Sequence, residues 1–206
     1  MSELRRSEFA VTDATTIREL LDSVRFGSLA YLRVDGTPGV SVLNFVRIED
    51  LIYFHGSPHG ERAASLRVNP SVAFLAADPL ALIPSHFLHP ELACPATQFF
   101  RSVVIRGEVR IVRDRAEKAI ALAAFMQKLQ PEGGYAPVRD DDLYRKSLEA
   151  TEVFALPVGV ATAKFKLGQN LPAHKRREVA DRIAERGSSV DLATVKAMRE
   201  LGLLGD

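Results

Sequence analysis

The chain has 206 residues, 47% of them hydrophobic and 26% charged, with a formal net charge of +1; this composition is typical of a globular protein and excludes a disordered chain. The near-neutral charge gives no electrostatic reason to expect nonspecific binding to nucleic acid or to an anionic membrane. The single cysteine, Cys94, excludes an internal disulfide, and no stretch approaches the roughly 20 apolar residues of a membrane span, so we expect a soluble, cytoplasmic protein.

The first part of the chain predicts a helix followed by an antiparallel meander. Apolar residues recur at helical spacing over residues 15–24, and Thr12 or Asp13 can cap this helix. Residues 34–39 have the composition of a tight turn, because their Asp-Gly pair readily adopts the positive φ that hairpin turns require. We predict three antiparallel strands around this turn, over residues 26–34, 40–48 and 51–55.

The remainder of the chain predicts further strands and several helices. After a loop and a short helix that ends at Asn69-Pro70, strands are predicted over residues 71–77, 98–114 and 149–167. Gly107 interrupts the second of these strands and predicts a bulge or bend. Helices are predicted over residues 115–129, 141–148, 172–187 and 190–202.

Residues 78–97 contain four prolines and no periodicity, and we predict an irregular insertion there, of the kind that often covers a site. About six strands interrupted by helices, without a βαβ rhythm, predict a mainly β (α+β) fold. The expected architecture is a small antiparallel barrel with helices on its outside.

The segment from Tyr53 to Arg62 has the composition of a phosphate-binding loop. Its glycines expose backbone N–H groups, and it leads from the end of a strand into the first turn of a helix, where the helix dipole is positive. Arg62 adds a cation that can form charged hydrogen bonds. The alternative is an ordinary polar loop between a strand and a helix, because loops rich in Gly and Ser are common.

Two sets of side chains have the chemistry of metal ligands, but neither predicts a metal site. His55 and His59 are four residues apart on a loop, without an acidic third ligand nearby, and His86, His89 and Cys94 lie in the predicted insertion. Metal sites usually need three or four converging ligands, so no metal is expected. Cys94 has no base that the sequence can assign to it, and we interpret it as a packed or exposed thiol rather than a nucleophile.

Two polar residues allow more than one interpretation. Asn44 interrupts an apolar strand, either as a satisfied residue at a sheet edge or as an amide directed into a ligand groove. Arg101 opens a later strand and either ends outside the barrel or contributes to a site. The basic run Lys175-Arg176-Arg177 lies on a helix that also carries acidic residues, which indicates a solvated face.

The order of these segments resembles that of a known family of flavoproteins. Residues 35–76 resemble the N-terminal half of pyridoxamine 5′-phosphate oxidase-like proteins, most closely the branch that includes nitroimidazole-resistance proteins: a strand ending in Tyr/Phe-His, a loop of small residues, a basic residue, a short helix and Asn-Pro. Residues 98–112 resemble a later strand of that family, in which aromatic-Arg-Ser-Val-Val is followed by Gly-x-x-Arg. The likeness spans roughly residues 10–160 and depends on the order and spacing of four weak motifs.

This resemblance implies a six-stranded antiparallel split β-barrel over residues 1–165, followed by a C-terminal helical tail over residues 166–206. It also implies a homodimer that binds FMN at the interface between its subunits. On the same basis, the insertion with His86, Phe87 and His89 is a candidate lid over the flavin.

The resemblance assigns cofactor binding to residues of the glycine-rich loop and of three strands: Ser41, Val42, Asn44, Phe54, His55, Gly56, Ser57, His59, Gly60, Arg62, Arg101 and Ser102. Within this set Arg62 and the loop before it would lie near the phosphate, and Arg101 would reach the ring or ribityl chain. His55 would be the catalytic residue, lying beside the flavin and donating a proton to the substrate, because the ordinary pKa of a histidine is near neutrality.

The sequence also departs from the oxidase. Residues 41–46 lack its longer basic signature, and Glu61-Arg62 stands where the oxidase has two basic residues, so oxidation of pyridoxamine phosphate itself is not expected. The stretch from Lys166 to Asn170 resembles a Lys-x-x-Gln-Asn stretch in the tails of FMN-binding regulator proteins. It either closes over the cofactor or simply connects the barrel to a surface helix.

We therefore expect an FMN-dependent oxidoreductase that acts on a small, aromatic or electron-poor molecule. The alternative is a non-catalytic flavin- or haem-binding sensor or regulator, and a deazaflavin in the same groove is a third option. Redox chemistry in this chain would depend on a bound organic cofactor, because one cysteine cannot form a redox pair and no metal cage is indicated. The expected partners are FMN, a small-molecule substrate and a second copy of the chain, without nucleic acid or membrane.

Overall fold

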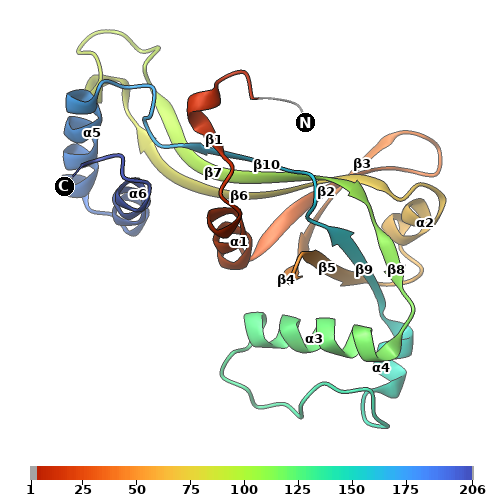
Figure 1. Ribbon diagram of the computed structural model, residues 1–206. Coiled ribbons are helices and arrows are strands. Elements are labelled where there is room, and N and C mark those ends of the chain that lie inside the picture. The colour runs from red at the N-terminus through yellow and green to blue at the C-terminus, as the bar shows by residue number, and fades with distance from the viewer. Residues whose placement is uncertain (1–3, 206) are drawn as a thin grey trace. The chain divides into compact units, whose positions relative to one another are not determined.

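The computed structural model describes residues 4–205 and contains two β-sheets with flanking helices (Figure 1). The strand order of the six-stranded sheet is β1 (Ala10–Val11), β10 (Ala161–Lys166), β7 (Thr97–Glu108), β6 (Ser71–Ile83), β2 (Phe26–Leu32) and β3 (Pro38–Asn44). The strand order of the four-stranded sheet is β4 (Val46–Ile48), β5 (Leu51–Gly56), β9 (Glu152–Pro157) and β8 (Arg110–Val112). The pairs β1–β10, β2–β3, β2–β6, β4–β5, β5–β9 and β8–β9 are antiparallel. The predicted mainly β fold with antiparallel strands and peripheral helices is confirmed.

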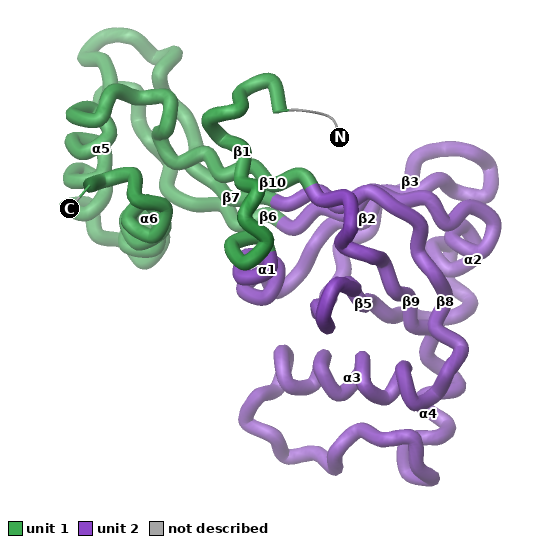
Figure 2. The backbone as a smooth tube through the Cα atoms, viewed as in Figure 1, with its two compact units in different colours: residues 1–17, 77–102, 162–206 green, residues 18–76, 103–161 purple. Residues whose placement is uncertain are grey.

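The chain divides into two compact units, which Figure 2 colours separately. Unit 1 consists of the residues up to 17, residues 77–102 and the residues from 162 onward. Unit 2 consists of residues 18–76 and 103–161. Helix α1 (Ala14–Ser23) and the long strands β6 and β7 contribute residues to both units.

In unit 2, helix α3 (Arg115–Leu129) covers the four-stranded sheet and shares a hydrophobic core with it. This core consists of buried residues of β4, β5, β8, β9 and α3: Val46, Tyr53, Val112, Ala121, Phe125, Val153 and Ala155. Strand β9 lies between β5 and β8, and its apolar run is buried throughout, as expected of a central strand covered on both faces. Helices α2 (Glu61–Val68) and α4 (Arg145–Ala150) complete this unit.

In unit 1, helices α5 (Ala173–Arg186) and α6 (Ser189–Glu200) pack against each other. Gly187 ends α5 in the left-handed conformation, with a φ of 71°. Ser188 then caps α6 in a capping box with Asp191. The 3-10 helices η1 (Ser7–Phe9) and η2 (Ser85–Phe87) complete the unit. Within residues 4–205, no helix is long and apolar enough to cross a membrane.

The prediction of one strand over residues 40–48 is wrong, because the chain leaves the six-stranded sheet at Phe45. Phe45 is completely buried and its ring meets the ring of Phe74 edge-on at 4.9 Å. Its carbonyl oxygen accepts a hydrogen bond of 3.1 Å from Lys128 Nζ instead of a ladder partner. The predicted meander is therefore divided: β2 and β3 pair in one sheet, and β4 and β5 pair in the other.

Two other predicted boundaries are wrong for similar reasons. The predicted strand 71–77 continues as β6 to Ile83, because buried Thr194 accepts a hydrogen bond of 2.9 Å from Ala81 N, so the irregular segment begins only at Pro84. The predicted strand 149–167 is two strands, β9 and β10, which belong to different sheets. The predicted bend near Gly107 corresponds to the interruption between β7 and β8, whereas the predicted helix 115–129 is confirmed with the same bounds.

Candidate functional site

The connection between β5 and α2 is a compact turn that its own hydrogen bonds close. Ser57 Oγ accepts a hydrogen bond from His59 N at 3.2 Å, and Gly60 N donates to Ser57 O at 3.4 Å. Gly60 is the N-cap of α2 and has an extended conformation, with no side-chain hydrogen bond to the first turn. Because a glycine has no side chain that could cap the helix, the N–H groups of the first turn are available to a ligand.

Arg62, in the first turn of α2, folds back onto the end of β5. Its Nη2 donates a hydrogen bond of 3.0 Å to His55 O, and its guanidinium carbon lies 5.7 Å from the centre of the Phe54 ring. A Cβ atom at Gly56 would lie 2.5 Å from Arg62 Nη2. The glycine at position 56 therefore provides the space that this arginine occupies.

The positive charge of Arg62 has no partner within the described part of the chain. No carboxylate of residues 4–205 lies within 4.0 Å of it, and its Nε is buried without a hydrogen bond. Burial lowers the pKa of Arg62 from its ordinary value. The neighbouring Glu61 turns to Tyr31 Oη at 2.9 Å and to Arg33 Nε at 3.1 Å. A half-buried cation of this kind is stabilised when an anion binds to it.

The imidazole of His55 lies beside this cation. Its ring stacks on the ring of Phe125, with the centres 4.6 Å apart and an interplanar angle of 10°. Its Nδ1 is buried and has no hydrogen-bond partner among the described residues. Burial lowers the pKa of His55, and the charge of Arg62 lowers it further. His55 is therefore neutral near pH 7, and residues 4–205 leave its Nδ1 free to form a hydrogen bond with a ligand.

An ion pair holds the loop in place. Arg67 Nη2 donates to Pro58 O at 2.7 Å and to Glu152 Oε2 at 2.6 Å. The Glu152 side chain, from β9, is only 7% exposed, so this pair is shielded from solvent on one side. The loop is consequently fixed to the four-stranded sheet before any ligand arrives, which lowers the entropy cost of binding.

The structure brings together part of the predicted set of site residues. His55, Gly56, Arg62 and the turn Ser57–Gly60 form one cluster at the end of β5. Ser41 lies near it, since Tyr31 Oη is 3.3 Å from Ser41 Oγ and also contacts Glu61.

The other predicted residues are placed differently. Phe54 is completely buried, and its ring stacks on the ring of Phe154 with the centres 5.1 Å apart. Its side chain therefore belongs to the core on which the cluster packs. Val42 and Asn44 point to the opposite face of β3 from Ser41, and both are exposed. Asn44 Nδ2 donates to Arg25 O at 3.1 Å.

Arg101 and Ser102 belong to unit 1, where they have partners of their own. Arg101 donates to Asp78 Oδ2 from Nη2 at 2.6 Å and from Nε at 3.1 Å. Ser102 Oγ donates to Lys164 O at 3.3 Å. In unit 1 the charge of Arg101 is thus already paired, unlike that of Arg62.

The sequence did not indicate two contacts that shape the cluster. Phe125 was predicted only as part of a helix, and its stacking on His55 arises from the packing of α3 on the sheet. The Arg67–Glu152 pair joins residues 85 positions apart, and no local pattern relates them. A metal site is not formed here: within residues 4–205, no three His, Cys, Asp or Glu side chains are grouped as metal ligands.

Two mostly antiparallel sheets with peripheral helices and a glycine-rich turn at the end of β5 are the features of a split β-barrel protein. Residues 13–165 match the family model described as pyridoxamine 5′-phosphate oxidase, and the chain therefore belongs to the pyridoxamine 5′-phosphate oxidase-like family. The predicted family and split-barrel fold are confirmed. No curated protein matches the chain.

Solved structures show the same fold. The flavocytochrome Anf3 from Azotobacter vinelandii is 25% identical, with a TM-score of 0.67 over 79% of this chain and 72% of that one. A FAD and heme binding protein from Mycobacterium smegmatis is 21% identical, with a TM-score of 0.66 over 87% and 80% of the two chains. A candidate 5-nitroimidazole antibiotic resistance protein from Bacteroides thetaiotaomicron is 21% identical, with a TM-score of 0.60 over 75% and 85%.

Proposed function

We propose that this chain is an FMN-binding flavoprotein and an oxidoreductase that acts on a small molecule. The observation that carries the proposal is the half-buried charge of Arg62, which has no counterion within residues 4–205 and lies beside an unsatisfied His55 nitrogen. A phosphate group would supply both the missing negative charge and the missing acceptors. Family membership and the flavocytochrome likeness support a flavin as the molecule that carries this phosphate.

The residues of the cluster have distinct roles in this proposal. Arg62 and the uncapped N–H groups at the start of α2 bind the phosphate, and the Arg67–Glu152 pair keeps the preceding loop in position. A bound flavin would supply two-electron transfer chemistry, which no side chain of this protein can provide.

His55 is proposed as the proton donor to the substrate. The stacked ring of Phe125 fixes the orientation of the imidazole and excludes water from one of its faces. Because burial and Arg62 lower the pKa of His55, the protein keeps the ring neutral until an anion binds next to it. A nearby phosphate dianion raises a histidine pKa, so cofactor binding would bring His55 toward the protonation state that a donor needs.

We further propose that the protein is a homodimer. The second copy covers the face that β3, β2 and β6 expose in unit 2. On this face Val42 and Leu75 flank Ser28, and Val40 and Ala73 flank Ala30, in the register of β3, β2 and β6. Val40 and Val42 are each 68% exposed, and Phe26 on the same face is 60% exposed. A contiguous apolar patch of this kind is typical of an interface, and it would place Val42 and Asn44 where subunits meet.

A haem-binding protein is the second candidate function. The flavocytochrome likeness at 25% identity favours it specifically, because that protein's name includes a cytochrome. The two candidates differ in their visible spectra: haem produces a Soret band, whereas a flavin does not.

The test is the absorption spectrum of the purified protein, followed by the mass of the ligand that denaturation releases. We expect the visible bands of an oxidised flavin, either as purified or after FMN is added. Arg62→Ala should weaken FMN binding by about 1.5–3 kcal/mol, or roughly 10- to 100-fold in Kd, because a charged hydrogen bond to phosphate is lost.

Arg145→Ala is the matched control, since Arg145 is an exposed cation of the same unit whose only ion pair among residues 4–205 is with Asp142. It should leave the Kd for FMN unchanged. Arg62→Lys keeps the charge but not the planar fork and should give an intermediate Kd. A protein that neither carries nor gains flavin absorbance, or an Arg62→Ala variant with wild-type affinity, would contradict the proposed site.

A further inference from the structure

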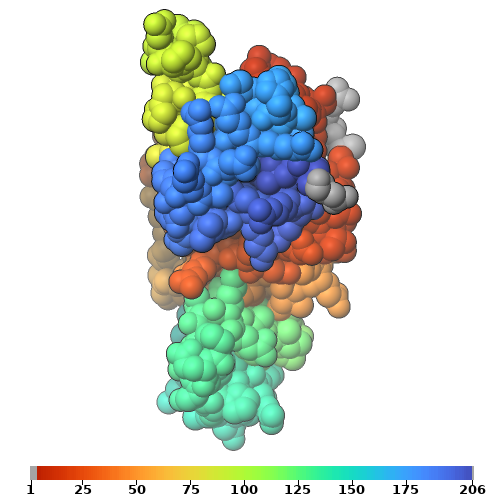
Figure 3. Space-filling view, turned by 90° about the vertical axis from the view of Figure 1, so that its left-hand side faces the viewer, coloured from red at the N-terminus to blue at the C-terminus, as the bar shows by residue number. Residues whose placement is uncertain are grey.

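Unit 1 contains a cavity of about 410 Å³, which lies at the segment between η2 and β7 and at the segment after β10. Leu88, Pro95, Phe99 and Leu171 provide an apolar wall. Figure 3 shows the first segment in yellow-green beside the blue surface of the second. The volume is within the range of cavities that bind small molecules.

Cations line the other wall. Arg6, Lys166 and Lys175 all border the cavity, and the exposed Asn170 lies between the last two in the chain. Lys164 is two residues before Lys166 on β10 and therefore points to the same face of the strand.

Two of the three cations on this wall have an acidic neighbour, and among residues 4–205 the third, Lys166, does not. Glu178 pairs with Lys175 at 2.8 Å, and Glu8 approaches Arg6 only to 3.9 Å. No carboxylate of residues 4–205 lies within 4.0 Å of Lys166, whose Nζ instead donates a hydrogen bond to Thr97 Oγ1. Burial lowers the pKa of Lys166, and the neighbouring charges of Lys164 and Arg6 lower it further.

The backbone holds this arrangement in a defined turn. Gly168 has a φ of +88°, which a residue with a side chain rarely adopts. Gln169 bridges the turn, because its Oε1 accepts from Leu167 N at 2.7 Å and its Nε2 donates to Phe165 O at 2.7 Å. The positions of Lys166 and Leu171 at the cavity are therefore fixed before a ligand binds.

We propose that this cavity is a binding site for a small organic anion, with its carboxylate or phosphate group on Lys166 and its apolar body against Phe99 and Leu171. The cations of Arg6 and Lys175 complete the anion-binding wall. This site is distinct from the proposed flavin site in residues and in compact unit, and it does not depend on flavin binding.

The probes for the test are benzoate, phenyl phosphate and the neutral isostere benzamide. Binding of each to the protein is measured by calorimetry or by ligand-observed NMR. We expect both anions to bind and benzamide to bind at least about tenfold more weakly, because an isostere without charge leaves Lys166 without its partner. A stronger response to phenyl phosphate than to benzoate, or the reverse, identifies the head group.

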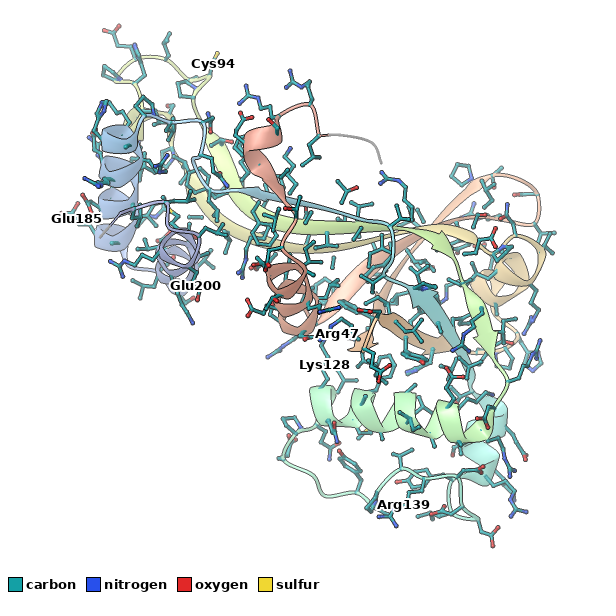
Figure 4. The ribbon with its side chains drawn as sticks, in the orientation of Figure 1. Arg47, Cys94, Lys128, Arg139, Glu185 and Glu200 are labelled. Atoms are coloured by element: carbon teal, nitrogen blue, oxygen red, sulfur yellow. The ribbon has the colours of Figure 1, made fainter. Side chains whose placement is uncertain are left out.

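The single cysteine of the chain shows where the probe binds. Cys94, which Figure 4 labels, is exposed and borders the cavity. Because it is the single cysteine of the chain, a neutral disulfide reagent such as 4,4′-dithiodipyridine reports on this cavity alone. Benzoate should slow the reaction of Cys94 several-fold at saturation, whereas benzamide should not.

The variant Lys166→Gln should lose at least about tenfold in affinity for benzoate and lose the protection of Cys94. Lys175→Gln, in the same wall of the cavity, provides the same test if Lys166→Gln does not fold. Lys196→Gln is the matched control, because it removes the same charge from α6 at a side chain that is 77% exposed and, in the described part of the chain, pairs only with Glu200.

Arg62→Ala separates this proposal from the flavin site, because it should leave benzoate binding unchanged. Equal binding of benzoate and benzamide, or wild-type benzoate affinity in both lysine variants, would overturn the proposal. So would a loss of benzoate binding in Arg62→Ala with no loss in Lys166→Gln.

Discussion

At the scale of single residues, the candidate site consists of two groups that lack partners among residues 4–205: the charge of Arg62 has no counterion, and His55 Nδ1 has no hydrogen-bond partner. Arg62 keeps its charge while half-buried, and His55 stays neutral beside it because burial disfavours a second positive charge. A bound anion would supply a counterion to Arg62 and a hydrogen-bond partner to His55. The sequence showed these residue types seven positions apart, but the hydrogen bond from Arg62 to His55 O depends on how α2 folds back onto β5.

The lowered pKa of His55 predicts a pH-dependent stability for the flavin-free protein. The unfolded chain protonates His55 near its ordinary value of 6.5, whereas the folded protein resists protonation until a lower pH. The free energy of unfolding should therefore fall as the pH falls below 6.5, and it should level off once the folded-state pKa is passed. His55→Gln should reduce this decrease.

The measurement is urea unfolding of the wild type and of His55→Gln between about pH 7.5 and about pH 5.5. The other histidines are common to both proteins, so their contribution cancels in the difference. Parallel pH dependences in the two proteins would show that His55 is not held neutral by the fold.

At the scale of elements, the site depends on where β3 ends and on how closely β2 approaches β6. A strand continuing through Phe45 would have kept Val46–Ile48 out of the four-stranded sheet on which β5 and His55 depend. The local alternation of apolar residues did not reveal this break, because Lys128 of α3 binds the carbonyl of Phe45 from 83 residues away. The helices, whose signals are local, were predicted much more closely.

Gly27 permits the close packing of β2 against β6. A Cβ atom there would lie 2.4 Å from Phe74 Cζ and 2.8 Å from Leu75 O. Phe74 is completely buried and the carbonyl belongs to the sheet, so neither can yield easily. We expect Gly27→Ala to lower the free energy of unfolding by about 1–3 kcal/mol or more.

Urea unfolding of Gly27→Ala against Gly159→Ala measures this effect. A Cβ atom at Gly159 meets no atom within 4 Å, and its backbone does not require a glycine, so that variant should be close to neutral. Equal stability of the two variants would mean that β2 and β6 are less closely packed than described.

At the scale of the whole molecule, the exposed apolar face of β3, β2 and β6 predicts a dimer. Val42→Asp places a charge on this face and should shift the mass in solution from two chains toward one, since an unpaired charge in an interface is costly. Because Val42 is 68% exposed in the single chain, the substitution should leave the fold of each chain intact.

Light scattering coupled to gel filtration measures this mass over a range of protein concentrations. Leu143→Asp is the matched control, because Leu143 is 67% exposed but lies outside the sheet face, and it should stay dimeric. A Val42→Asp protein that remains dimeric would place the interface elsewhere.

The predicted division of the chain at residues 165 and 166 stays a prediction; the compact units group the tail with residues 77–102.

The sequence by itself determined the family, the mainly β class, the helices with clear caps and periodicity, and the segment that carries the candidate site. These features depend on local signals: turn residues, the spacing of apolar side chains and the order of short motifs. The tertiary structure decided which sheet each strand joins and which charges are left without partners. Those outcomes depend on contacts between distant residues, such as Phe125 with His55 and Lys128 with Phe45, because the burial of a charge is a property of the assembled core and not of its neighbours in sequence.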